Sequence, residues 1–170
     1  MVFDLTVHAD QFSCVGSEVG VNCGEISVDH LESCGTAEIE RIASSQTAAI
    51  ALPGASLGLG MQHTPARQLL DAGASLVIAS DWNPGSAPMG DVLVQAAVLG
   101  AAELLTMAET LAALTTRAAA ALNVYDRGQL SPGYLVDMQA YPVDDYRGIL
   151  YNQGKIKPSV VWKNGIPYVN

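Results

Sequence analysis

TPARQLLDAGASLVIASD, residues 64–81, combines a complete helix signal with a strand signal. Thr64 is a good N-cap, the proline after it suits the first helical position, and Gly73 is a good C-terminal stop. The apolar run 76–80 follows and ends at Asp81. A helix that leads directly into a buried strand is typical of alternating β/α structure.

Three further apolar runs precede this unit at similar intervals, and each reads as a strand. Thr36 can cap a helix that ends near Ala43, between the second and third of these runs. Repeated alternation of this kind predicts an α/β fold with parallel strands and helical crossovers. The three runs are residues 5–9, 26–31 and 47–52, the last stopped by Pro53 and Gly54.

The chain changes character after the fourth strand. Two helices are expected first, at 91–104 and at 106–122, and the second opens with a capping box formed by Thr106 and Glu109. From Gly128 onward turn and strand signals replace the helices. Strands are expected at 134–141, 160–163 and 166–169, the last two joined by an Asn164-Gly165 hairpin, so the tail predicts a small antiparallel sheet.

Composition limits the classes of function. The 170 residues are 49% hydrophobic and only 15% charged, which favours a well-covered core over a disordered chain. The 8 basic and 17 acidic residues give a net charge of −9, which argues against nucleic acid or a membrane surface as partner.

The location follows from what the sequence lacks. The N-terminal MVFDLTVHAD has no basic stretch of a signal peptide, and charges at Glu103, Glu109 and Arg117 interrupt the most apolar stretch. The three cysteines show no CxxC spacing, so they are expected to be free core residues in a reducing compartment. These features predict a cytoplasmic protein.

Polar side chains stand near the carboxyl ends of three predicted strands. Strand alternation puts His8 on one face with Asp10, and places His30 on the face of Val28. Asp81 follows the fourth strand. In a parallel α/β barrel this end carries the active site, and two imidazoles with a carboxylate suit a divalent metal, zinc by default and iron as the other choice. A single His or Asp at a strand end is often only a structural cap, so the pattern alone leaves both readings open.

Several motifs together resemble a known family, imidazolonepropionase, a metal-dependent amidohydrolase of histidine degradation. The block containing Asp81, Asn83, Gly85 and Ser86 is the most specific of them. In chain order they are VHADQFS (7–13), SVDHLE (27–32), ALPGAS (51–56), TPARQLLDAG (64–73), ASDWNPGSAP (79–88), LTTRAAAAL (114–122) and DRGQLSPGYLVD (126–137).

The resemblance implies a fold, a reaction and site residues. Residues 1–128 would form the C-terminal half of a TIM (β/α)₈ barrel, and residues 129–170 strands of a small β-sandwich. The reaction would be hydrolysis of 4-imidazolone-5-propanoate to N-formimino-L-glutamate, with water activated by one zinc or iron ion. By the same resemblance His8 and Asp81 are metal ligands, His30 and Asp81 are catalytic, and Gln11, Asn83, Gly85 and Ser86 bind the substrate.

The most serious departure of the sequence from the family is what it lacks. The family's first barrel strand carries a His-X-His pair that binds the metal, and this sequence has no His-X-His. The chain is therefore expected to need a missing N-terminal half, and alone to be unstable or to self-associate into a homo-oligomer, with little activity. Two alternatives stay open: another cyclic amidase or deaminase of the same superfamily, and a non-catalytic half-barrel interaction module.

Overall fold

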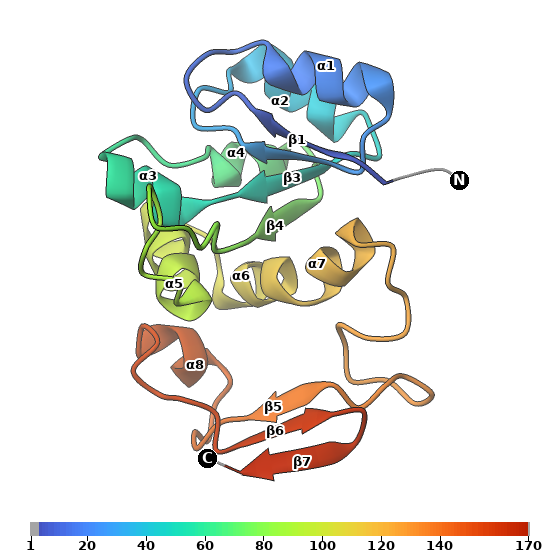
Figure 1. Ribbon diagram of the computed structural model, residues 1–170, viewed down its shortest axis with the longest axis vertical. Helices are drawn as coiled ribbons and strands as arrows, with labels where there is room; N and C mark the ends of the chain where they lie inside the picture. Colours follow the sequence, from blue (N-terminus) through green and yellow to red (C-terminus); the bar gives the residue numbers. More distant parts are fainter. Residues whose placement is uncertain (1–3, 170) are drawn as a thin grey trace.

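A parallel four-stranded sheet organises the first half of the chain in the computed structural model, which describes residues 4–169 (Figure 1). The strands lie side by side in chain order, and Val7 of the first pairs with Val28 of the second. Every neighbouring pair is parallel, as the alternating pattern predicts. The strands are β1 (Thr6–Ala9), β2 (Ser27–His30), β3 (Ala48–Ala51) and β4 (Leu76–Ile78).

Helices α1 (Gly16–Cys23), α2 (Thr36–Ala43) and α4 (Ala66–Asp71) connect these strands. In Figure 1, α1 and α2 lie over β1 and β2, and α2 also packs on α4. Gly20 of α1 lies so close to Val28 that a Cβ there would overlap its side chain. This face of β1 and β2 therefore turns toward the helices.

The main apolar core lies between the parallel sheet and the helices that pack on it, and side chains from residues 96–113 also contribute to it. Its residues are nearly all short or branched aliphatic side chains, which suits the tight spacing of parallel strands and helices. They include Val28, Leu31, Ile39, Ile42, Leu69, Leu76, Ile78 and Leu99.

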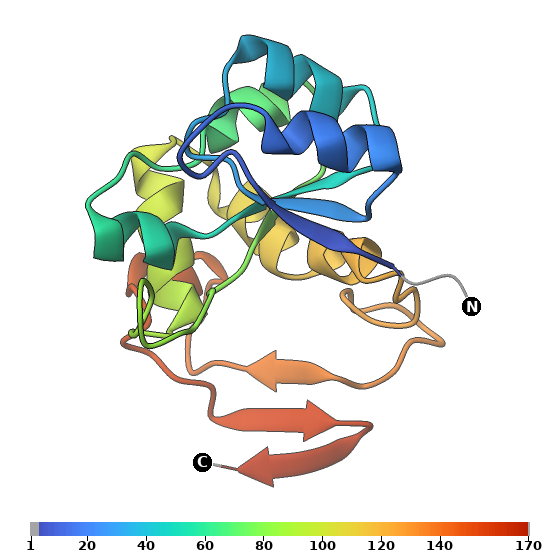
Figure 2. The ribbon, with the colours of Figure 1, turned by 45° about the horizontal axis from the view of Figure 1, so that its top comes forward.

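Helices of the second half separate the two sheets in Figures 1 and 2. They are α5 (Val92–Ala102), α6 (Met107–Leu114) and α7 (Thr116–Ala121), with α3 (Pro53–Leu59) packed against α5. Beyond them a three-stranded antiparallel sheet is built from β5 (Met138–Ala140), β6 (Val160–Lys163) and β7 (Ile166–Val169), and α8 (Arg147–Tyr151) packs on α5. The expected α/β architecture, a parallel sheet followed by a small antiparallel one, is confirmed.

Some local expectations are wrong. Thr64 does not cap α4, because its hydroxyl donates instead to the carbonyl of His30. The expected single helix 106–122 has the predicted capping box but breaks at Thr115, giving α6 and α7. Cys14 and Cys23 are exposed rather than core residues, although all three cysteines are free as expected. No helix within residues 4–169 is long and apolar enough to cross a membrane.

Candidate functional site

The two candidate histidines meet near the carboxyl ends of β1 and β2. His8 is an exposed residue of β1, and His30 is the buried last residue of β2. Nδ1 of His8 lies 2.8 Å from Nε2 of His30, and the ring centroids are 4.9 Å apart. Residues far apart in sequence are thus joined by a direct ring-to-ring hydrogen bond.

His30 reaches His8 because the backbone leaves the strand conformation at this point. His30 has φ +81° and Leu31 has φ +70°, values that side-chain-bearing residues seldom adopt. Thr64 donates its hydroxyl hydrogen to the His30 carbonyl, which holds this conformation. The expectation that His30 shares the face of Val28 is therefore wrong: Val28 faces α1, whereas the His30 ring contacts His8.

Asp10 also departs from simple strand alternation. It has φ +51°, is 3% exposed, and does not continue the His8 face. Its carboxylate instead accepts hydrogen bonds from the amides of Gly16 and Ser17, at 2.7 and 3.1 Å, and from the Ser17 hydroxyl. Asp10 thus anchors the start of α1 behind the site.

Asp29 is a site residue that the sequence reasoning missed. It pairs in register with His8 on the neighbouring strand. The pKa of Asp29 lies above its ordinary value, chiefly because the carboxyl group is buried. The hydrogen bond from Ser27 and the nearby His8 and His30 lower this pKa in part, and the charge of Asp81 raises it. Asp29 therefore lies close to His8, His30 and Asp81, the residues predicted to carry the chemistry. Only the strand register, which the sequence does not give, could have identified it.

The loop after β4 is built around Asn83. Its Oδ1 accepts from the amides of Gly85 and Ser86 at 2.8 and 2.9 Å. Its Nδ2 donates to the Asp81 carbonyl at 2.6 Å and to the Ser86 hydroxyl at 3.0 Å. Asp81, half-buried with φ +47°, lies in this loop beyond the strand. The Asn83 side chain is thus occupied in shaping the loop that carries Asp81.

Gln11, the one predicted binding residue outside this loop, follows the end of β1. Gln11 is half-buried, and its main-chain carbonyl accepts from Ser33. Trp82 is 75% exposed and lies flat against Gly90. An open hollow of about 400 Å³ adjoins it, lined by Trp82, Asn83, Pro84 and Pro88.

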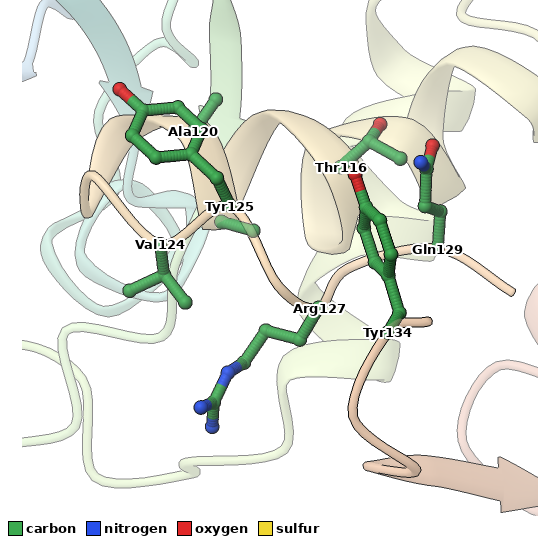
Figure 3. Close-up of a pocket in the computed structure, with 8 residues that line it drawn as sticks. Thr116, Ala120, Val124, Tyr125, Arg127, Gln129 and Tyr134 are labelled. Carbon is green, nitrogen blue, oxygen red and sulfur yellow. The ribbon is translucent and has the colours of Figure 1, made fainter. Parts of the chain in front are cut away.

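A second hollow, of about 100 Å³, lies between α7 and the loop leading to β5 (Figure 3). Arg127 on its wall is paired with Asp126 and Asp137. Its lining residues are Thr116, Ala119, Ala120, Val124, Tyr125, Arg127, Gln129 and Tyr134, and none of the predicted site residues is among them.

The donor set fits part of a metal site. An imidazole on His8 and a carboxylate on Asp81 are suitable ligands for zinc or iron. The bond from His8 Nδ1 to His30 leaves His8 Nε2 as the nitrogen that can face a metal. Within residues 4–169, however, no three His, Cys, Asp or Glu residues are grouped closely enough to hold an ion. These two residues therefore fit as part of a coordination shell.

Comparison with known proteins extends this picture. An imidazolonepropionase of Deinococcus deserti is 42% identical over 94% of the chain, and one of Deinococcus radiodurans is 44% identical over 87%. The chain spans 40% and 37% of the lengths of these two relatives. The expected resemblance to imidazolonepropionase is confirmed.

Solved structures support the same fold. A zinc-bound adenosine deaminase from Xanthomonas campestris matches with a TM-score of 0.70 and 25% identity, over 84% of this chain and 36% of that one. A 5-methylcytosine deaminase from Klebsiella pneumoniae matches with a TM-score of 0.76 and 17% identity, over 96% of this chain and 47% of that one. The second likeness is one of fold alone.

The family model described as the amidohydrolase family matches residues 5–165, nearly the whole chain. Its range includes every strand of the parallel sheet, the paired histidines and the Asp81 loop. The chain belongs to the amidohydrolase family.

Proposed function

We propose that this chain forms part of an imidazolonepropionase, an enzyme that opens 4-imidazolone-5-propanoate to N-formimino-L-glutamate. The observation that carries the proposal is 42% identity to an imidazolonepropionase over 94% of the chain. The direct contact of His8 with His30 at the carboxyl ends of the strands supports it, because active sites of α/β barrels lie at that end.

One divalent ion, zinc or iron, would be held in part by His8 and Asp81. When bound, such an ion supplies a Lewis acid for the ring carbonyl and a water nucleophile that is active at neutral pH. The zinc reported for the similar adenosine deaminase supports this assignment. The remaining ligands would come from a part of the barrel outside these residues.

The chain's own residues would then manage protons and orient the ring. Asp81 would take the proton from the attacking water, and His30 would shuttle a proton or stabilise the oxyanion that develops at the ring carbonyl. Water adds across the cyclic amide, and the ring C–N bond breaks. Gln11 can hydrogen-bond the ring but cannot act as a base.

Asn83, Gly85 and Ser86 would contribute to substrate binding through the loop that they form. The side chain of Asn83 is engaged with its own loop, so its part is to present the exposed Gly85 and the half-buried Ser86 to the ring. Residues 1–128 would belong to the barrel and 129–170 to the β-sandwich. The working protein would be cytoplasmic and would include an N-terminal barrel half, either as a single copy or as a homo-oligomer.

The test is an assay of the protein expressed from the complete reading frame that contains this sequence. We expect loss of imidazolone propanoate and formation of N-formimino-L-glutamate, followed by mass spectrometry. His30→Gln and Asp81→Asn should each lower kcat/KM by about 100-fold or more. His63→Gln, which changes a histidine outside the proposed machinery, should leave kcat/KM unchanged. A folded, metal-loaded protein that does not open the ring would refute the proposal.

A deaminase is the second candidate, favoured by the 25% identity to the adenosine deaminase. Deamination releases ammonia from an amino-substituted ring, whereas opening of the imidazolone ring releases none. Ammonia release from amino-heterocycles, with no turnover of imidazolone propanoate, would support this alternative. Turnover of neither class by the loaded protein would favour a non-catalytic module.

A further inference from the structure

A line of polar side chains leads from α3 to the candidate site. Ser56 of α3 donates its hydroxyl hydrogen to Oε1 of Glu32 at 2.8 Å. Oε2 of Glu32 lies 3.7 Å from Nδ1 of His30. Nε2 of His30 in turn lies 2.8 Å from Nδ1 of His8. Four side chains from three segments (α3, the end of β2 with the turn after it, and β1) thus form a series that ends at the exposed His8.

The middle of this series is deeply buried. The side chains of Glu32 and His30 are 1% and 4% exposed. Among residues 4–169, neither His30 Nδ1 nor Glu32 Oε2 has a hydrogen-bond partner, although the two atoms face each other. Leaving two such atoms unpaired in the interior is unfavourable, and a small side-chain rotation would close the gap to a hydrogen bond.

The order of donors along the series follows from elementary chemistry. Glu32 Oε1 accepts the hydroxyl hydrogen of Ser56, and a carboxylate that accepts at both oxygens pairs with a donor at Oε2, where His30 Nδ1 is the ring atom that faces it. A neutral imidazole that donates at Nδ1 accepts at Nε2. His30 Nε2 therefore accepts the Nδ1–H of His8, and the lone pair of His8 is left at Nε2.

The backbone fixes the two residues at the centre. His30 and Leu31 hold left-handed conformations that such residues adopt only when their surroundings enforce them. The Leu31 amide donates to the Ala9 carbonyl at 3.1 Å, and the Ser33 amide donates to the Asp10 carbonyl at 2.7 Å. The turn that aims His30 at His8 is thus tied to the end of β1 on both sides of Glu32.

We propose that Glu32, held by Ser56, is a positioning residue that fixes His30 as the Nδ1–H tautomer. Through His30 it fixes His8 in the tautomer whose Nε2 is free to bind a metal. This deepens the proposed function and rests on it only for the roles of the two histidines. It describes the protein without substrate, in which His30 Nε2 accepts from His8 and is not yet free for the ring. It explains why a carboxylate and a serine hydroxyl are buried beside a site in which neither contacts His8.

Nitrogen NMR of the protein from the complete reading frame, labelled with ¹⁵N-histidine and loaded with diamagnetic zinc, tests the proposal. Long-range ¹H–¹⁵N correlations distinguish a ring protonated at Nδ1 from one protonated at Nε2. Signals are assigned with single substitutions of His8, His30 and His63. Above the titration range of imidazole, both His8 and His30 should carry their proton on Nδ1. A His30 ring protonated at Nε2 in the unsubstituted protein would overturn the proposal.

Substitutions then test whether Glu32 is what sets the tautomer of His30. Glu32→Met, which keeps the side-chain length but removes the acceptor, should abolish the protonated Nδ1 signature of His30 as the dominant species. Ser56→Ala should weaken that signature while keeping the carboxylate. Glu40→Met, an exposed glutamate on α2, is the matched control and should change nothing.

The outcomes distinguish failure of the positioning role from failure of the proposed function. If Glu32→Met fails to fold by circular dichroism, the spectra of the unsubstituted protein and of Ser56→Ala still decide. An unchanged His30 tautomer in folded Glu32→Met would contradict the proposal. The expected tautomers in a protein without ring-opening activity would support the positioning role and reject the proposed function alone.

Discussion

At the residue scale, Asp10 lies directly after strand β1, and its side chain fixes the start of helix α1. The chain turns at φ +51°, and the carboxylate accepts three hydrogen bonds at the start of α1. A negative charge at a helix N-terminus is favourable, and the buried carboxylate has no water to replace these donors. Asp10 therefore holds the end of β1 in place, and with it the position of His8.

Replacement of this anchor should be costly. We expect Asp10→Ala to lower the free energy of unfolding by about 2–3 kcal/mol, because buried amide and hydroxyl donors lose a charged acceptor. Asp10→Asn, which keeps one acceptor oxygen, should lose less. Urea denaturation measures both, with the exposed Asp144→Ala as control. Equal stability of Asp10→Ala and the control would show that the anchor is not needed.

The three cysteines should differ in reactivity. Burial, together with nearby Asp10 and Glu38, raises the pKa of the Cys34 thiol to about 12, whereas Cys14 and Cys23 are exposed. Because the thiolate is the nucleophile, Cys34 should be alkylated at least about tenfold more slowly than the other two at neutral to mildly alkaline pH.

Peptide mapping after timed treatment with iodoacetamide measures this difference. In denaturant the three rates should converge, which separates the effect of the fold from that of local sequence. Equal rates in the native protein would contradict the buried environment of Cys34.

At the element scale, the sequence predicts the presence of strands better than their ends. Each expected strand of the parallel sheet exists, because short apolar runs bounded by turn residues are typical of buried strands. The break at Thr115 was not predicted. Gly128, from a later turn, lies close to it, since a Cβ on Gly128 would approach the Thr115 carbonyl oxygen to 3.0 Å. The short helix α8 (Arg147–Tyr151) lacked a periodic pattern and was missed.

One close contact joins α3 to the loop that carries Asp81. A Cβ on Gly58 would overlap the carbonyl oxygen of Ser86. We therefore expect Gly58→Ala to push the loop away and to lower the free energy of unfolding by about 1–3 kcal/mol. Leu59→Ala, at an exposed position of the same helix, should change it by less than about 0.5 kcal/mol. Denaturant unfolding distinguishes the two, and equal effects would disprove the tight contact.

At the scale of the whole molecule, the motifs predicted the family, because they follow one another along nearly the whole chain and the block containing Asp81 and Asn83 is specific. The contact of His8 with His30 and the position of Asp29 could not be predicted, since both depend on strand register and on left-handed backbone at His30. The described residues offer two proposed metal ligands on a chain that spans 40% of a similar imidazolonepropionase. The proposed enzyme therefore depends on His8 and Asp81 binding the same ion.

Metal content of the protein from the complete reading frame tests this dependence most directly. After loading with zinc or iron and removal of free ion, inductively coupled plasma mass spectrometry should find one ion per chain. His8→Ala and Asp81→Ala should each weaken binding by about tenfold or more, whereas His63→Ala should retain the ion. Full metal content in both site variants, or none in the unsubstituted protein, would contradict a metal-dependent amidohydrolase site at His8 and Asp81.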